Sequence, residues 1–306
     1  MLKKILSVVC LAVMAGTVVA QEAAIKISPK FEVGKRTGVT EVKLTQILSI
    51  FGQEQRSKSQ NFVTTERTTK SLGADRFEVK NEVKRMQVNM ELGPLQLSYD
   101  SENPDGANVS APLQPVISAL QAQMKAVPVY EIDGKTNKVL GVQIDKSVLD
   151  NVPPAMRTNL SDESLREKYQ QSQTKFPKKS VKPGDTWDAT VKADLGGGQV
   201  MEFEVTYKYE GPATVDGRKL HKITSKVTSV DFDIDPDGGL GVTVKNTDLK
   251  VKKSTGTIHY DAKLGAFASE AEMVQVVGKL TLDVNGMESE GTLDLTMENN
   301  SKIKSD

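Results

Sequence analysis

The residues best spaced for chemistry are four aspartates in the segment DFDIDPDGG, residues 231–239. Asp233, Asp235 and Asp237, followed by Gly238, match the first half of a calcium loop, in which alternate carboxylates converge on a hard cation. Such a loop ends in a bidentate glutamate at its twelfth position, but here that position is Val244. The same residues fit a strand that ends in a Pro-Asp-Gly turn. We favour the strand, and calcium binding stays an open alternative.

The other reactive residue types lack the spacing of a known site. His221 and His259 lie in strand-like stretches without a zinc-binding pattern, and His259 alternates with its apolar neighbours. No Gly-x-Ser-x-Gly elbow occurs, and the glycines at 196–198 fit a hairpin tip better than a phosphate loop. We therefore predict no catalytic, cofactor-binding or metal-binding residue, no cofactor and no enzyme activity. A hydrolase with a carboxylate pair outside any motif is a third, less favoured class.

Charge and composition exclude several partners. The chain has 40 basic and 40 acidic side chains, and without Lys3 and Lys4 the balance is 38 to 40, so no global field attracts nucleic acid. Aromatic residues make up only 5% of the chain, too few for the stacking platforms of many sugar and single-strand readers. The densest positive segment is KFPKKSVK, residues 175–182. We interpret it as a solvated linker, with contact to an anionic surface as the alternative.

The first twenty residues have the layout of a bacterial-type signal peptide. Lys3 and Lys4 precede an apolar stretch, and the small residues of Val18-Val19-Ala20 predict cleavage after Ala20. Polar sequence follows at once, so we expect no transmembrane segment in the mature chain. Cys10 is the only cysteine and lies inside the apolar stretch, so a mature chain would have no thiol. The sequence therefore predicts export to the periplasm or the extracellular space.

Alternating apolar residues dominate the rest of the chain. They predict antiparallel strands with one buried and one wet face. The pattern that begins at Phe77 slips by one residue at Lys84-Arg85, which predicts a bulge. Asp-Gly and Asn-Gly pairs favour tight turns between the strands. The clearest later runs lie at 201–209, 230–234, 280–284 and 293–297, and the turn pairs at 133–134, 216–217, 237–238 and 285–286.

Two segments have helical spacing instead. Residues 112–127 are expected to form a helix with Ser110 as its cap, and residues 154–176 a second one that starts near Ser161 and stops before Pro177. Their apolar stripes are typical of helices that cover a sheet. Trp187, the only tryptophan, is expected to plug the edge of the core where a strand begins.

The two halves of the chain show a weak internal sequence similarity. VYEIDGKTNKV at 129–139 parallels TIHYDAKLGAF at 257–267, so that Asp133 and Lys135 match Asp261 and Lys263. Both stretches are typical of a strand, an Asp-x-Lys turn and a second strand. A duplicated β-meander and chance similarity of β-rich segments both remain open.

Two stretches resemble a known family. FPKKSVKPGDTW at 176–187 and GTIHYDAKLGAFASE at 256–270 resemble an uncharacterised family of exported bacterial β-rich proteins, a domain of unknown function. The resemblance implies a β-rich envelope protein and carries over no catalytic or binding residue. Members often have a signal peptide or lipid anchor, whereas the residues before Cys10 do not form a lipid-attachment motif.

We expect a mainly β (α+β) fold, in which two antiparallel β-meander halves form a curved sheet or half-barrel with two covering helices. The expected division is a signal peptide at 1–20, an N-terminal β-rich half with one helix at 21–150, a helical linker at 151–180 and a C-terminal β-rich half at 181–306. The predicted function is that of an exported, non-enzymatic cell-envelope protein. Two hypotheses stay open: an apolar ligand or lipid bound in an open β-barrel, or a structural or protein-interaction module with a solid core. The methionines among the strands fit an adaptable ligand surface or core filler equally well; they are Met86, Met90, Met201, Met273 and Met297.

Overall fold

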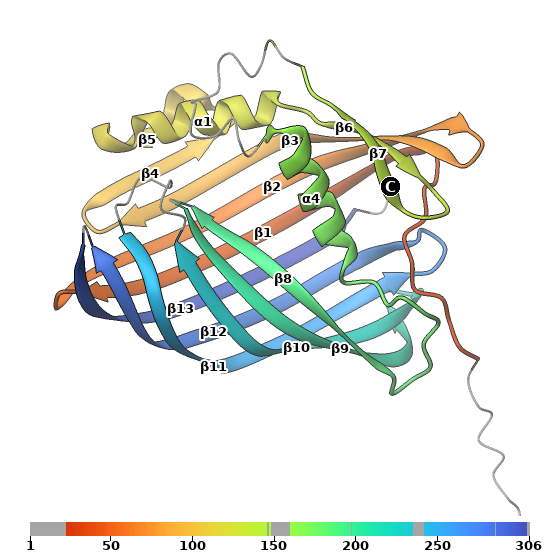
Figure 1. Cartoon of the computed structure of the whole chain (residues 1–306). Helices are drawn as coiled ribbons and strands as arrows, with labels where there is room; N and C mark the ends of the chain where they lie inside the picture. Colours follow the sequence, from red (N-terminus) through yellow and green to blue (C-terminus); the bar gives the residue numbers. More distant parts are fainter. Residues whose placement is uncertain are drawn as a thin grey trace, which may run out of the picture.

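The computed structural model describes residues 23–145, 147, 160–196, 198–234, 242–284 and 286–304. The predicted signal peptide and its cleavage site lie outside these residues, as do Asp235 and Asp237. Within them, thirteen strands form one antiparallel sheet that does not close. The expected mainly β fold, with a curved sheet and two covering helices, is confirmed (Figure 1).

Residues 34–173 supply seven strands and two α-helices. The strands are β1 (Gly34–Ile50), β2 (Gln53–Gly73), β3 (Arg76–Leu92), β4 (Leu95–Asp100), β5 (Asn108–Val109), β6 (Val129–Asp133) and β7 (Lys138–Gln143). The helices are α1 (Gln114–Lys125) and α4 (Asp162–Gln173). The second half forms a meander of long strands: β8 (Thr186–Gly196), β9 (Gln199–Val215), β10 (Arg218–Ile234), β11 (Val242–Asp261), β12 (Ala266–Val284) and β13 (Met287–Ile303).

The two meanders are joined by the first and the last strand. The order across the sheet is β5-β4-β3-β2-β1-β13-β12-β11-β10-β9-β8, with β6 and β7 attached to β3. β1 pairs with β13 from Gly38 opposite Ile303 to Ile50 opposite Gly291. The predicted bulge in β3 is confirmed, because Lys84 has no partner where Thr64 and Thr65 pair with Arg85 and Val83.

The sheet is strongly curved, and its C-terminal strands, β8 to β13, form the curl (Figure 1). The Gln46 side chain on β1 donates a 2.9 Å hydrogen bond to Gln199 on β9, although four strands lie between them in the sheet. Ser225 on β10 donates to Glu272 on β12 across β11. This approach requires Gly256 on β11, because a Cβ there would lie 1.8 Å from the Ser225 Oγ.

Apolar side chains fill the inside of this curl. The largest cluster contains side chains from β1 and from every strand between β9 and β13. It includes Met201, Phe203, Ile258, Leu282 and Leu295, each at most 4% exposed. We call the face that carries these side chains the inner face. By register it continues across β13, β1 and β2 to Met86 and Val88 of β3, where α1 covers it. α4 packs with β6 and β7 through Leu165 and Tyr169.

The helices match the expected segments, but only one predicted cap is right. Ser161 caps α4, since its side chain accepts a hydrogen bond from the Ser164 backbone N–H. Ser110 does not cap α1; its hydroxyl accepts instead from the backbone N–H of Gln96 on β4, and the helix begins four residues later, at Gln114. The hydrogen bond from β4 therefore takes the place of the capping hydrogen bond that this serine could otherwise form with the helix.

Candidate functional site

A hollow of mixed polar and apolar lining lies on the inner face between α4, the start of β12 and the start of β1. We call it the inner-face pocket; its volume is about 350 Å³. It combines four cationic side chains with one carboxylate and an apolar wall. Its lining is Pro29, Lys30, Arg36, Arg67, Tyr169, Ser172, Gln173, Lys175, Phe176, Gly265, Ala266, Phe267, Glu270 and Ile303.

Two arginines stand side by side in this pocket. Arg36 on β1 and Arg67 on β2 are directly opposite in the antiparallel register, so their side chains leave the same face. Arg36 donates to Glu32 at 2.9 Å and to the Leu264 carbonyl at 3.1 Å. Arg67 instead lies over the Phe31 ring, with 5.7 Å between its Cζ and the ring centroid. Burial and the like charge of Arg36 lower the pKa of Arg67, while neighbouring Tyr169 partly counteracts both.

On the opposite wall, Lys175 is held between two glutamates of β12. Its Nζ lies 2.7 Å from Glu270 and 2.9 Å from Glu272. Burial lowers the pKa of Lys175, but the two carboxylates outweigh burial and raise it overall. The interpretation of residues 175–182 as a solvated linker is therefore wrong at its first residue, because the inner-face carboxylates draw this lysine inward.

Aromatic rings close the pocket behind Lys175. Phe176 stacks on Phe267 with 4.5 Å between ring centroids and 12° between ring planes. Tyr260 meets both rings edge-on and donates from its hydroxyl to the Ser28 carbonyl. The pocket thus has an apolar wall beside cationic groups, an arrangement that suits a molecule with an apolar part and an anionic part.

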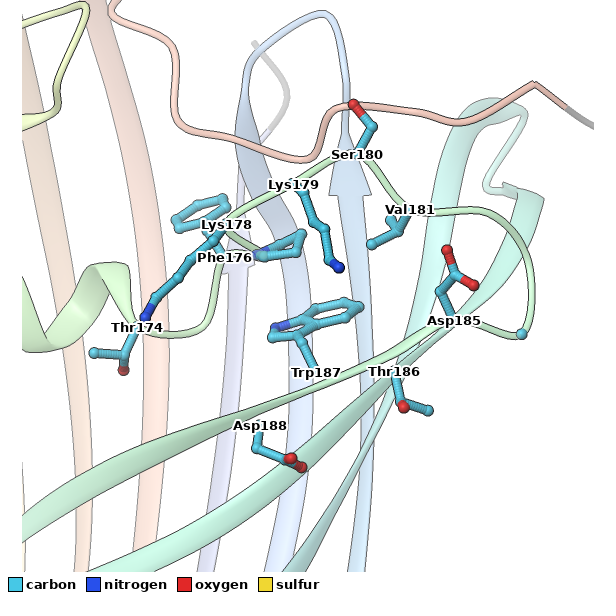
Figure 2. Close-up of a pocket in the computed structure, with 12 residues that line it drawn as sticks. Thr174, Phe176, Lys178, Lys179, Ser180, Val181, Asp185, Thr186, Trp187 and Asp188 are labelled. Atoms are coloured by element: carbon cyan, nitrogen blue, oxygen red, sulfur yellow. The ribbon is translucent and has the colours of Figure 1, made fainter.

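A second hollow, of about 580 Å³, lies inside the arch formed by residues 174–188 (Figure 2). Its floor is Trp187, which stacks on Tyr207 at 5.6 Å and donates from Nε1 to the Lys175 carbonyl. Figure 2 shows the Lys179 side chain extending toward the indole. Trp187 thus lies at the start of β8 against the largest cluster, as predicted.

The residues that carry the family resemblance account for the shape of this arch. Val181 is buried and pairs with Ile25. Gly184 has φ +94°, where a side chain would be strained, and its N–H donates to the Tyr209 carbonyl. The Asp185 carboxylate accepts from the Lys182 N–H. These contacts give the motif a structural role.

The two Asp-x-Lys turns have the same geometry. Asp133 accepts from the backbone N–H groups of Lys135 and Thr136, and Asp261 accepts from those of Lys263 and Leu264. The fourth residue after each aspartate, Asn137 and Gly265, has φ +58°. The likeness between the halves therefore extends to the hydrogen bonds of the turns, while duplication itself stays a hypothesis.

The remaining chemical residues stay apart. His221 bonds the Tyr209 hydroxyl and His259 bonds Ser269, each as part of a strand. Burial, and to a smaller degree Lys222, lowers the pKa of His259. Asp233 is exposed on β10, but Asp235 and Asp237 lie outside the described residues, so calcium binding stays an open alternative to the favoured strand.

Sequence reasoning missed the inner-face pocket. Arg36 and Arg67 look like ordinary solvated charges of alternating strands, because the register that places them opposite each other is not visible in the sequence. The available signal was indirect: Arg67 has the same parity as Val63 and Thr65 on β2 and therefore shares their face.

Comparisons with known proteins define the family but not the activity. No curated protein matches the sequence. Among solved structures, lipovitellin, in a study of its lipid–protein interactions, aligns at TM-score 0.45 and 9% identity over 90% of this chain. The chain spans about a quarter of that protein (26%). A putative exported protein from Bacteroides fragilis with a YmcC-like fold aligns at TM-score 0.25 and 7% identity, covering 92% of this chain and 100% of that one.

A third similar structure, DynF from the dynemicin biosynthesis pathway of Micromonospora chersina, aligns at TM-score 0.20 and 10% identity, covering 92% and 85% of the two chains. All these scores are too low to carry a functional argument. In the described part of the chain, neither helix has the length and apolar character that crossing a bilayer requires. A family model matches residues 74–267, well over half of the sequence. The chain therefore belongs to a family of unknown function, DUF6263.

Proposed function

We propose that this is an exported, non-enzymatic cell-envelope protein that binds an apolar ligand or lipid on the inner face of its open half-barrel. Export rests on the signal-peptide pattern of residues 1–20. The non-enzymatic part rests on the sequence, in which the reactive residue types lack catalytic spacing.

The observation that carries ligand binding is a row of half-buried side chains between the packed clusters. On β1, β2 and β13, the inner-face residues next to the pocket are neither fully buried nor fully exposed. We call them the central strip: Gly38, Thr40, Val42, Leu44, Ser59, Asn61, Val63, Thr65, Met297, Asn299, Ser301 and Ile303. Ile303 also lines the inner-face pocket, so the strip and the pocket are continuous by register.

The dimensions of the strip suit a chain-like molecule. From Gly38 to Leu44 the strand advances six residues, or about 20 Å at the rise of an extended chain. One leaflet of a bilayer's hydrocarbon core is about 15 Å thick, so an acyl chain fits along the strip. The buried Oδ1 of Asn61, opposite Val42, has no hydrogen-bond partner among the described residues.

Two variants of β1 test this proposal. Val42→Lys places a charge in the central strip, whereas Val39→Lys places the same charge on the other face of the same strand, at a residue of the same burial class. We expect Val42→Lys to abolish binding of a hydrophobic fluorescent probe and Val39→Lys to retain it, with both variants folded by circular dichroism. Equal binding by both variants would refute the central strip as the binding surface.

Native mass spectrometry with lipid extraction, on protein purified from a secreting host, addresses the ligand class. A stoichiometric apolar molecule supports the proposal. A clean apo mass together with failure to take up the probe would refute it.

The second candidate function is a protein-interaction module with a solid core. This second function is favoured by the side-chain packing inside the curl, where Tyr260, Leu282 and Leu295 are each 0% exposed. Side chains buried to this degree among the described C-terminal strands favour a solid core. The same probe experiment separates the two candidates, because a module of this kind binds no probe in either variant.

A further inference from the structure

We propose that Arg67, with Arg36 beside it, forms an anion site that binds the phosphate or carboxylate head of an amphipathic ligand whose tail lies along the central strip. This inference rests on the proposed function and specifies its ligand. It follows from the pocket's charges, its walls and its position at one end of the strip.

The first step is the charge balance of the inner-face pocket. Its lining contains four cations, Lys30, Arg36, Arg67 and Lys175, and one carboxylate, Glu270. Two further carboxylates pair with these cations from outside the lining: Glu32 with Arg36, and Glu272 with Lys175. These seven groups carry a net charge of +1, and two of the cations, Lys30 and Arg67, have no carboxylate partner among the described residues.

The second step assigns this charge to Arg67. Arg36 already has Glu32, and Lys175 has two glutamates. The Lys30 amine donates to the Ala262 carbonyl and is exposed to water. Arg67 is half-buried and, within the described residues, has no carboxylate within 4.0 Å. A guanidinium in this setting favours an oxyanion, which it bonds through two parallel N–H groups.

The third step concerns the rest of the ligand. The stacked rings of Phe176 and Phe267 and the side chain of Ile303 form the apolar side of the same pocket. Ile303 lies opposite Gly38, where the central strip begins. When the anionic head of a ligand binds Arg67, its apolar tail can be buried either against the rings of Phe176 and Phe267 or along the central strip. Lys175 neutralises Glu270, the pocket's own carboxylate, which would otherwise repel the head group.

Calorimetric titrations below the micelle concentration test the site with three probes: octyl phosphate, octyl glucoside and inorganic phosphate. The wild-type chain is compared with Arg67→Gln, with Arg67→Lys and with the control Arg56→Gln. Arg56 lies on the same strand, is 68% exposed and pairs with Glu54. A charge-assisted pair predicts that Arg67→Gln binds octyl phosphate about tenfold more weakly, with partial rescue by Arg67→Lys. Octyl glucoside binding and the Arg56→Gln control should stay at wild-type levels.

The outcomes separate the two proposals. If octyl phosphate binds the wild type and Arg67→Gln equally well, the anion site is wrong and the amphiphile-binding function stands. If octyl glucoside does not bind, and inorganic phosphate and octyl phosphate bind with the same affinity through Arg67, the anion site stands and the apolar ligand is wrong. If none of the three probes binds, the anion site is refuted and so is a surface for simple amphiphiles.

Discussion

Replacing Lys175 by methionine removes a cation that lies between two glutamates, Glu270 and Glu272. The side chains of Lys175, Glu270 and Glu272 are only 18%, 14% and 22% exposed. Breaking a buried ion pair by removing one partner costs 3–5 kcal/mol, and residual solvent access places this site near the lower end, at about 3 kcal/mol. Urea denaturation followed by far-UV circular dichroism measures the loss. With a slope of about 3 kcal/mol/M, the midpoint falls by about 1 M.

The pH dependence of the Lys175→Met variant gives an independent check. In the wild type the raised pKa of Lys175 means that its stabilisation is complete below about pH 10 and is lost only as pH rises through the folded value. Without the lysine, the two carboxylates repel each other. The variant is therefore destabilised less at pH 5 than at pH 8, because protonation relieves the repulsion.

A matched triple variant identifies the cause. Lys175→Met combined with Glu270→Gln and Glu272→Gln removes the repulsion and should recover most of the lost stability. The reasoning is refuted if the triple variant is as unstable as Lys175→Met alone, or if Lys175→Met shifts the urea midpoint by less than about 0.2 M.

Two further predictions concern the sheet. Gly278→Ala should lower the melting temperature by several degrees in a thermal scan, because its Cβ would lie 2.1 Å from the Asp248 carbonyl oxygen. Gly141→Ala should change little, because its Cβ would make only an ordinary contact, at 3.8 Å from the Glu131 Cβ. Equal melting temperatures for the two variants would contradict the close approach of β11 and β12. Arg85, foremost through its hydrogen bond, lowers the pKa of Asp100 to about 2. The stabilisation from the ionised Asp100 is thus present above about pH 4 and lost as pH falls through 2. Asp100→Asn should therefore be less stable than the wild type at pH 6, with most of that difference gone at pH 2, in acid-denaturation curves. A stability difference that is the same at both pH values would rule out this pair as the cause.

The sequence was most informative where local rules decide the structure. Alternation in β9 and β12, the bulge at Lys84 and the cap at Ser161 follow from preferences of neighbouring residues, and all three are confirmed. Ser110 was mispredicted because a strand brought close by the fold competes for its hydroxyl. The expected division of the chain into two halves and a linker stays a prediction.

The candidate site was less accessible to prediction because its parts come from distant segments. Arg36 and Arg67 meet through the β1–β2 register, and Lys175 meets Glu270 across 95 positions of the chain. In each case the sequence shows a charged residue in a polar context, and only the sheet determines which charges share the inner face. Local patterns do not contain this information.

The pairing of β1 with β13 also constrains how the chain acquires its structure. Among the thirteen described strands, the two that join the meanders, β1 and β13, are synthesised first and last. Each meander can form its local hairpins early, but their union must await the final strand, and contacts of such long sequence separation slow folding. Until then both inner borders carry unpaired backbone groups that can associate with other chains. Loss of the 17 residues of β13 would therefore split the sheet at its centre rather than shorten its edge.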